Sequence, residues 1–124
     1  MQQKYFWIIG IIIVAVVVAI FLINPIQKIP ENEPKWVNEL ITNKINNPVA
    51  NPPASLSKCT YKGEIVYYLP PRCCDVYSVL FNENGNVICS PDGGFTGDGD
   101  GRCTDFFEER KNCEVIWKDS RSYP

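Results

Sequence analysis

Six cysteines are the residues of this chain whose type and number point most clearly to chemistry. All lie in the C-terminal half, and they are Cys59, Cys73, Cys74, Cys89, Cys103 and Cys113. An even number of cysteines in a short chain is typical of a disulfide framework in an oxidising compartment. The chain has no CxxC pair and no histidine, which argues against a thioredoxin-type pair, a zinc site and a histidine-activated catalytic cysteine. We therefore expect three structural disulfides.

The adjacent pair Cys73 and Cys74 narrows the choice of partners. A bond between neighbours requires a strained peptide, and on an extended chain the two side chains point to opposite faces, so each should take a different partner. We predict that this pair bonds to Cys89 and Cys103, in either order, and that the two outermost cysteines bond to each other. Each bridge would contribute about 2–4 kcal/mol by restricting the unfolded chain.

The second candidate for chemistry is the glycine-rich loop SPDGGFTGDGDGR at residues 90–102. Its candidate ligand or partner residues are Asp92, Gly93, Gly94, Phe95, Asp98 and Asp100, with Asp105 just beyond. A loop of this length is often functional. Alternating carboxylates before a glycine resemble part of a calcium loop, but the full spacing and the closing glutamate are missing. We expect a structural loop pinned by disulfides and predict no cofactor, while a partner-contact loop and a calcium site stay open.

Charge and composition exclude some classes of function. The 124 residues carry 12 Lys+Arg and 14 Asp+Glu, a net charge of −2, which lacks the basic footprint of a nucleic-acid-binding protein. The absence of histidine removes the commonest general base. Asp75, Asp92 and Asp100 offer paired carboxylates for a hydrolase, although each has a simpler role in a turn or cap. We expect that the protein is not an enzyme.

An apolar segment precedes the cysteine region. Phe6 to Ile23 is a run of 18 residues without a charge, and as a helix it would span roughly 27 Å, close to a hydrocarbon core. Tyr5 and Trp7 stand at its start, where amphipathic rings favour the membrane interface. No small-x-small cleavage site follows, so we predict an uncleaved signal-anchor over residues 5–23 rather than a cleaved signal peptide.

The orientation of this anchor follows from the cysteines. The flanking positive charges are nearly balanced, with Lys4 and the α-amine before the segment and Lys28 and Lys35 after it. Disulfides persist outside the cytoplasm. We therefore predict a cytoplasmic tail at residues 1–4 and a periplasmic or extracellular C-terminal domain.

One small domain is expected behind a tether. Three prolines make residues 24–34 a semi-extended tether whose role is spacing, and the disulfide-rich domain spans residues 35–124. Residues 34–46 predict an amphipathic helix that packs on the domain. Its apolar face consists of Trp36, Val37, Leu40, Ile41 and Ile45.

Patterns of period two follow this helix and predict an antiparallel sheet. The expected strands are residues 64–69, 75–81, 87–89 and 113–117. A turn is expected at residues 61–64, and Asn84-Gly85 is the strongest hairpin signal. A short helix is expected at residues 104–111, capped by Thr104 or Asp105.

The resulting fold class is small α+β. It comprises an N-terminal transmembrane helix, an amphipathic helix and a disulfide-stapled antiparallel β-sheet with a short helix. Along residues 64–69 the alternation predicts that one of Tyr67 and Tyr68 lies in the core while the other is half-exposed. Core packing is favoured over a tyrosine-lined binding face.

Several blocks of this region, taken together, resemble a known family. They are Tyr61-x-Gly63 with Val66-Tyr67-Tyr68, Cys73-Cys74-Asp75, Asn84-Gly85-Asn86-x-Ile88-Cys89-x-Pro91-Asp92-Gly93-Gly94, and Gly97-x-Gly99-Asp100-Gly101-x-Cys103-x-Asp105-Phe106. Over about residues 34–119 the chain resembles a family of small exported bacterial domains of unknown function, many of whose members are lipoproteins. The chain departs from that family in its expected spanning anchor and in having no lipid-attachment cysteine.

The resemblance bears on the cysteines and on the loop. Cys59 and Cys113 are additional to the four-cysteine pattern of the family, which favours their pairing with each other. At Asp98 the family is variable and often basic, whereas Asp100 belongs to its pattern, and this weakens the calcium interpretation. The resemblance implies no activity.

These observations together predict a membrane-anchored, extracytoplasmic, disulfide-stabilised domain that acts as a binding or structural module. The expected partners are the membrane, through residues 5–23, and an unknown protein or surface ligand, with no nucleic acid. One alternative is an accessory subunit of a membrane complex that uses Gly10 as a helix contact. The others are a carboxylate-dependent hydrolase and a protease inhibitor built on a rigid loop.

Overall fold

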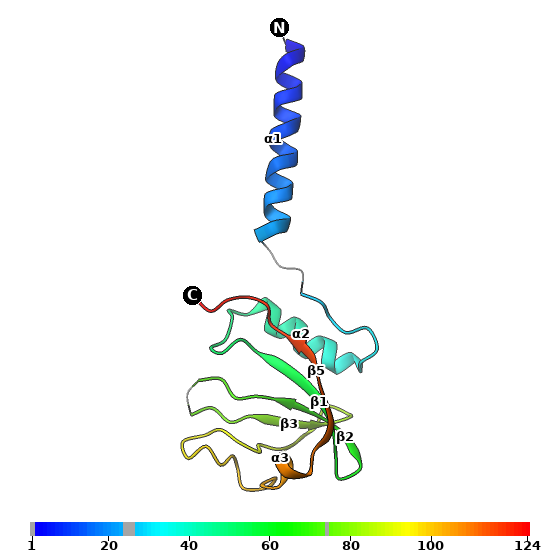
Figure 1. Ribbon diagram of the computed structural model, residues 1–124, viewed down its shortest axis with the longest axis vertical. Helices are drawn as coiled ribbons and strands as arrows, with labels where there is room; N and C mark the ends of the chain where they lie inside the picture. Colours follow the sequence, from blue (N-terminus) through cyan, green and yellow to red (C-terminus); the bar gives the residue numbers. More distant parts are fainter. Residues whose placement is uncertain (1, 24–26, 74) are drawn as a thin grey trace.

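The computed structural model describes residues 2–23, 27–73 and 75–124. Within them it contains α-helices and β-strands in the order of a small α+β protein (Figure 1). The elements are α1 (Gln2–Ile23), α2 (Lys35–Asn46), β1 (Ser55–Tyr61), β2 (Glu64–Leu69), β3 (Val79–Asn82), β4 (Val87–Cys89), α3 (Phe106–Glu109) and β5 (Lys111–Lys118).

The first helix, α1, contains the long apolar run. Most of its described apolar side chains are exposed, and Figure 1 shows the helix standing apart from the other elements. Across the three described stretches of the chain, no helix has both the length and the apolar character needed to cross a membrane.

The five strands form one antiparallel sheet in the order β4-β3-β2-β1-β5. The β1–β2 hairpin closes through Lys62 and Gly63, which have φ angles of 51° and 85°. A two-residue turn with positive φ at both positions matches the twist of the strands it joins. Gly85 supplies the positive φ of the β3–β4 turn, which confirms the hairpin predicted at Asn84-Gly85.

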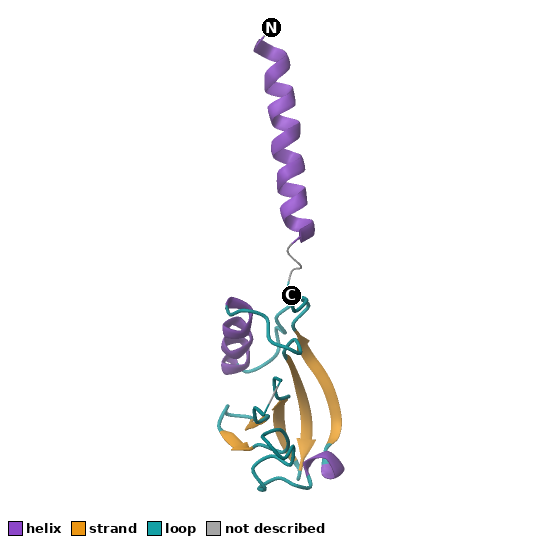
Figure 2. Ribbon diagram, turned by 90° about the vertical axis from the view of Figure 1, so that its left-hand side faces the viewer, coloured by secondary structure: helices purple, strands orange, loops and turns teal. Residues whose placement is uncertain are grey.

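Both faces of the sheet are covered, and this sets the core. On one face α2 packs through Val37 and Ile41 against residues that include Leu56, Tyr67 and Trp117 (Figure 2). This confirms that the apolar face of the amphipathic helix packs on the sheet. On the other face the glycine-rich loop and α3 cover a second cluster, built from Cys59, Tyr61, Val66, Tyr68, Leu80, Cys89, Cys103 and Phe106.

The second layer corrects the prediction for the two tyrosines. Tyr67 and Tyr68 point to opposite faces of β2, as the alternation requires, but both are buried. Neither ring is half-exposed because the loop and α3 shield the face that we expected to be partly open. Core packing of both rings is confirmed.

Element boundaries differ from prediction where tertiary contacts compete with strand pairing. The expected strand at residues 75–81 begins only at Val79, because Val76 and Ser78 bond to the glycine-rich loop instead: Gly94 N donates to Val76 O and Ser78 N donates to Asp92 O. The helix expected at residues 104–111 is the shorter α3. β5 is longer than the expected strand at 113–117, since its outer residues pair with β1.

Two disulfides join parts of the sheet and its covering loop. Cys59 on β1 bonds to Cys113 on β5, which confirms the pairing of the outermost cysteines. Cys89 bonds to Cys103, so the prediction that this pair bonds to Cys73 and Cys74 is wrong. The loop between Cys89 and Cys103 folds back and places both sulfurs in the core cluster, whereas Cys73 is exposed at the end of the sheet. Cys73 is also disulfide-bonded, and predictions for Cys74 lie outside the described residues.

Residues 27–34, which we expected to be a spacer, contact the domain. The Gln27 amide donates to an Asp119 carboxylate oxygen at 3.1 Å and to Ser120 Oγ at 2.9 Å. Glu33 accepts hydrogen bonds from Lys58 Nζ and from the Tyr67 hydroxyl, at 3.0 and 2.7 Å. This part of the tether is therefore held against the sheet.

Candidate functional site

The glycine-rich loop uses one of its carboxylates, Asp100, to hold its own shape. Asp100 accepts hydrogen bonds from the backbone N–H groups of Ser90 and Arg102, both at 3.0 Å. The Arg102 guanidinium donates to the same carboxylate at 2.6 and 2.8 Å. These bonds, led by the Arg102 side chain, lower the pKa of Asp100 below its usual value. Asp100 therefore acts as a staple between the two ends of the loop.

Asp92 fastens the start of the loop to the sheet. Its carboxylate accepts a hydrogen bond from the Tyr68 hydroxyl at 2.8 Å. Its backbone N–H donates to Ser78 Oγ at 3.1 Å, and its carbonyl accepts from the same hydroxyl at 2.9 Å. Ser78 is fully buried. Burial and the bond to Asp92 raise the pKa of Tyr68 well above its usual value, so this phenol stays protonated.

Asp105 was predicted as a helix cap, and the structure gives it another role. It stands at the N-cap position of α3, but its side chain makes no capping hydrogen bond. Instead it accepts from the Tyr61 hydroxyl at 2.6 Å and pairs with Lys62 Nζ at 2.7 Å. The ion pair with Lys62 and the bond from Tyr61 lower the pKa of Asp105. The cap is lost because the β1–β2 turn brings these stronger donors to the carboxylate.

The tip of the loop carries the predicted residues that remain accessible. Phe95 is 90% exposed, and the Asp98 side chain has no partner among the described residues. Gly94 lies against the Tyr77 ring, where an added Cβ would collide. Gly93 lies equally close to the backbone at Val76. These two glycines allow the loop to pack directly on the segment before β3.

The predicted site residues therefore do not converge on one centre. Asp92, Asp100 and Asp105 each have their own donors, and within the described residues no group of three or more Cys, Asp or Glu side chains is placed to hold a metal ion. The arrangement favours the structural interpretation of the loop. It leaves Phe95 as an exposed contact on a rigid base.

A groove that the sequence interpretation missed lies beside the glycine-rich loop, whose Gly93 and Gly94 contact two of its lining residues, Pro71 and Tyr77. It has a volume of about 340 Å³, within the range typical of small-molecule pockets. Two proline pairs line it, one before β1 and one after β2. Its lining residues are Lys44, Pro52, Pro53, Ala54, Ser55, Leu69, Pro70, Pro71, Arg72, Val76, Tyr77 and Val79. We call this surface the proline groove.

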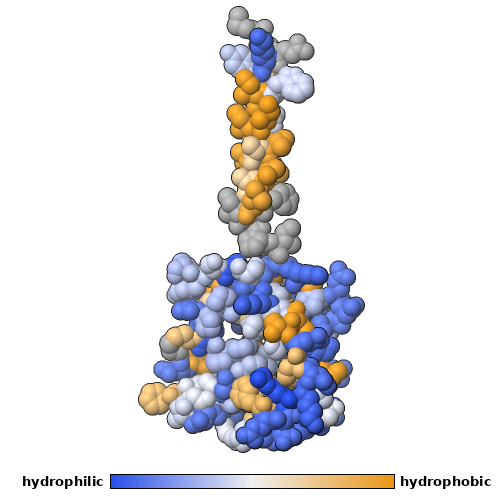
Figure 3. Space-filling model, in the orientation of Figure 1, coloured by the Kyte–Doolittle hydropathy of each residue, from blue (hydrophilic) through white to orange (hydrophobic). Residues whose placement is uncertain are grey.

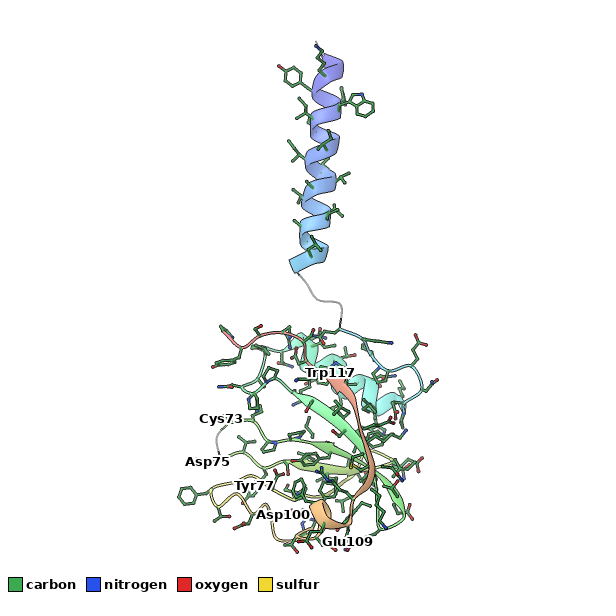
Figure 4. The ribbon with its side chains drawn as sticks, in the orientation of Figure 1. Cys73, Asp75, Tyr77, Asp100, Glu109 and Trp117 are labelled. Carbon is green, nitrogen blue, oxygen red and sulfur yellow. A yellow bond between two sulfur atoms is a disulfide. The ribbon has the colours of Figure 1, made fainter. Side chains whose placement is uncertain are left out.

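Strand pairing brings the two proline pairs together. In the antiparallel register, Ser57 of β1 lies opposite Tyr68 of β2, so the residues before β1 face those after β2. A backbone hydrogen bond from Cys73 N to Asn51 O, at 2.7 Å, ties the two segments beyond the prolines. Figure 4 shows Cys73, Asp75 and Tyr77 following one another along this side of the molecule.

Two cations at the proline groove have no acidic partner. Neither the Lys44 ammonium nor the Arg72 guanidinium makes an ion pair or a hydrogen bond with any described residue. Burial, together with the positive charge of Arg72, lowers the pKa of Lys44. Asp119 lines a neighbouring hollow that also contacts both cations, but its carboxylate is already paired with Arg121 at 2.7 Å. The groove therefore presents uncompensated positive charge beside an apolar floor.

The sequence contains one signal of this groove, which is its two proline pairs. The pairs Pro52-Pro53 and Pro70-Pro71 stand just outside a predicted hairpin, and antiparallel pairing places such flanks side by side. Lys44 comes from α2 and only the tertiary fold brings it to the prolines. A proline wall is rigid because the ring fixes φ, so the groove is formed before a ligand arrives.

Comparison with curated proteins and with solved structures finds no match to this chain. A family model does match, over residues 42–119. The matched stretch contains the glycine-rich loop and every residue that lines the proline groove, while α1 lies outside it. Because the match covers more than half of the chain, the protein belongs to the family described as a domain of unknown function, DUF6970.

Proposed function

We propose that this protein is a membrane-anchored, extracytoplasmic binding module whose disulfide-stabilised domain presents the proline groove to a ligand or partner. The observation that carries the binding role is the pair of unpartnered cations, Lys44 and Arg72, above an apolar floor. Lys44 is half-buried, and a charge withdrawn from water is normally paired. Arg72 is exposed and adds a second positive charge beside it. A charged pair of the same sign without a counterion is an arrangement that a bound anion would complete.

The anchoring part of the proposal is supported by α1. Its sequence holds 18 consecutive uncharged residues, and its apolar side chains have no cover, as the continuous apolar band of Figure 3 shows. Such a surface is unfavourable in water, since each buried methylene is worth about 0.8 kcal/mol. The disulfides support the extracytoplasmic side, because such bonds persist in oxidising compartments.

The enzyme alternatives have less support. The carboxylates considered for a hydrolase, Asp92 and Asp100, are bound by Tyr68 and by Arg102 at separate points of the loop. Asp75 is exposed. Hydrolysis of the glycosidase type, for which these residues were considered, uses two carboxylates that converge on one substrate. A binding module makes use of the observed groove without that requirement.

An accessory subunit of a membrane complex is the second candidate function. It is favoured by an exposed apolar face of α1 that consists of Phe6, Trp7, Gly10, Ile11 and Val14. A Cβ added at Gly10 would meet no atom within 4 Å. A small residue within an apolar helix face lets a second helix approach closely.

One cross-linking experiment tests the two candidates. A photoreactive residue is placed in the full chain, in its own cells, at Tyr77 in the proline groove, at Ile11 on α1, or at Val115 on β5. Val115 is the control because it is 64% exposed and lies away from both surfaces. We expect discrete adducts at position 77 that fall about tenfold when Lys44 and Arg72 are both changed to Gln, since charge-assisted contacts are among the stronger polar interactions.

The outcomes separate the candidates. A binding groove would be contradicted if the adduct yield at position 77 did not fall when the two cations are replaced. It would also be contradicted if that yield equalled the yield at position 115. Adducts confined to position 11 would favour the accessory-subunit role. Blocking of an introduced surface cysteine by an impermeant maleimide in intact cells locates the domain, and lack of labelling until lysis would contradict the extracytoplasmic side.

A further inference from the structure

We propose that the proline groove binds the C-terminal residue of a peptide, with the free carboxylate between Lys44 and Arg72 and an apolar side chain on the groove floor. This inference rests on the proposed binding role of the same groove and names its ligand class. It is argued from charge, from shape and from the neighbouring helix end.

The charges favour a single carboxylate. An arginine and a lysine together offer a forked donor and a point charge, which suit a carboxylate and its two oxygens. Lys44 belongs to the last turn of α2, where the helix dipole contributes partial negative charge. That field weighs against any anion, but about twice as much against a dianion such as phosphate, which binding proteins commonly hold at helix N-termini. A monoanion is therefore the better match.

The floor favours an apolar side chain close to the charge. Ala54, Leu69 and Val79 are half-buried apolar residues that line the groove together with the two proline pairs, and we call these three residues its floor. In a C-terminal amino acid the carboxylate and the side chain leave the same carbon, so both reach a site in which cations border an apolar floor. A sugar acid carries hydroxyl groups over its whole body, and an apolar floor would leave those groups without hydrogen-bond partners.

The open end of the groove favours a chain rather than an isolated amino acid. Tyr77 lines the groove and is 52% exposed. Gly94 lies directly on the Tyr77 ring, and the highly exposed Phe95 follows it. The preceding residues of a peptide could continue along Tyr77 toward Phe95. The rigid prolines reduce the entropy lost when the last residue is captured.

Titration followed by nuclear magnetic resonance tests the ligand class on the full chain in detergent micelles. The probe is the peptide acetyl-Gly-Gly-Gly-Leu with a free C-terminal carboxylate, and the matched control is the same peptide with an amidated C-terminus. We expect the free acid to shift the signals of Ala54, Val79 and Tyr77. The amide should bind about tenfold more weakly, since it loses the charge-assisted contacts.

Single substitutions test whether Lys44 and Arg72 recognise the carboxylate. Lys44→Met and Arg72→Gln should each weaken binding of the free acid by about tenfold, while Lys111→Gln removes an exposed lysine on β5 and should leave it unchanged. Both groove cations lack partners in the described structure, so their replacement should keep the fold, which the same spectra report. If one of the two groove variants unfolds, binding of the free acid is compared between the other variant and the parent chain.

Several results would overturn the proposal. The first is that the acid and the amide bind equally well, and the second is that neither variant weakens binding of the acid. The third is that inorganic phosphate or glucuronate binds more tightly at the same residues. The fourth is that the free acid causes no shifts at millimolar concentration. Cation-dependent cross-links at position 77 without peptide binding would overturn the ligand class alone. Loss of those cross-links as well would overturn the binding role of the groove.

Discussion

At the scale of single residues, the glycine-rich loop is shaped by backbone freedom and by carboxylates that accept local hydrogen bonds. Gly97 and Gly99 both adopt positive φ, at 84° and 69°, a region that costs other residues roughly 1–2 kcal/mol. Their surroundings differ. A Cβ at Gly99 would collide with the Ser90 carbonyl oxygen, whereas Gly97 has no atom within 4 Å of such a position.

Gly97 and Gly99 allow a prediction in which each substitution serves as the control for the other. Gly97→Ala should lower the free energy of unfolding by about 1 kcal/mol, the cost of positive φ alone. Gly99→Ala should lower it by about 3 kcal/mol or more, because the backbone at Ser90 and Asp92 must also move. Urea unfolding of the oxidised protein measures both. Equal losses would show that the close approach at Gly99 does not constrain the loop.

At the scale of elements, the C-terminal segment fixes the end of α2. The Arg121 guanidinium donates to the carbonyl oxygens of Lys44, Ile45 and Asn47, each at 3.0 Å. These carbonyls lie at the end of the helix, where the regular ladder of backbone hydrogen bonds stops. The Lys44 carbonyl also accepts a 3.3 Å hydrogen bond from the Asn47 N–H. Asp119 orients Arg121 through bonds at 2.7 and 2.9 Å. The pair therefore locks α2, and with it Lys44, in place.

This lock should depend on pH. The bond from Arg121 is the main cause that lowers the pKa of the 3% exposed Asp119. A carboxyl with a lowered folded-state pKa contributes stability above its unfolded pKa, near 4, and loses that contribution as pH falls through the folded value. Asp119→Asn should therefore cost about 1–3 kcal/mol near neutral pH, and the difference from the parent chain should shrink in acid.

Urea unfolding at a series of pH values measures the difference. Asp98→Asn is the control, because the exposed Asp98 side chain has no partner in the described structure and its replacement should have no pH-dependent effect. A constant gap between the parent chain and Asp119→Asn from neutral to acid pH would argue against the ionised Asp119–Arg121 lock.

At the scale of the whole molecule, the two bridges Cys59–Cys113 and Cys89–Cys103 stabilise a domain with a thin core on each side of one sheet. The bridge from Cys59 to Cys113 spans 54 residues of sequence and joins β1 to the edge strand β5. The bridge from Cys89 to Cys103 spans 14 residues and closes only the glycine-rich loop. In the chain-entropy description a longer closed loop restricts the unfolded state more.

The two bridges should therefore differ in their contribution. Replacing Cys59 and Cys113 by Ala should lower the free energy of unfolding by about 4 kcal/mol, and replacing Cys89 and Cys103 by about 3 kcal/mol. The second change should also make the loop near Phe95 sensitive to chymotrypsin, while the first should not do so in the native state. A larger loss from the short bridge would show that local packing, rather than chain entropy, dominates.

Much of the architecture follows from local sequence patterns. The alternation at residues 64–69, the Asn84-Gly85 turn and the apolar face of α2 each depend on the periodicity of the backbone itself. They predicted β2, the β3–β4 hairpin and the docked helix. The pairing of Cys59 with Cys113 was also predicted correctly. The family resemblance favoured it, whereas the assignment of Cys89 and Cys103 to the adjacent pair, from which it also followed, was wrong.

The remaining features depend on contacts between segments that are distant in sequence. The segment before β3 bonds to the glycine-rich loop, Asp105 leaves its helix for Tyr61 and Lys62, and Cys89 finds Cys103 in the core. In each case a local hydrogen bond or contact is replaced by one with a distant segment. Sequence periodicity predicts the local interaction but not the distant one.

The sequence by itself therefore determined the class of the molecule: an apolar helix ahead of a small, disulfide-stabilised α+β domain with one long loop. Tertiary structure alone decided which charges are paired and which surface we propose for binding. Asp92, Asp100 and Asp105 are held by internal donors, while Lys44 and Arg72, 28 positions apart in the chain, line one groove without an acidic partner among the described residues. The physical reason is that local pattern sets backbone conformation, whereas the pairing or isolation of a charge depends on which distant segment folds against it.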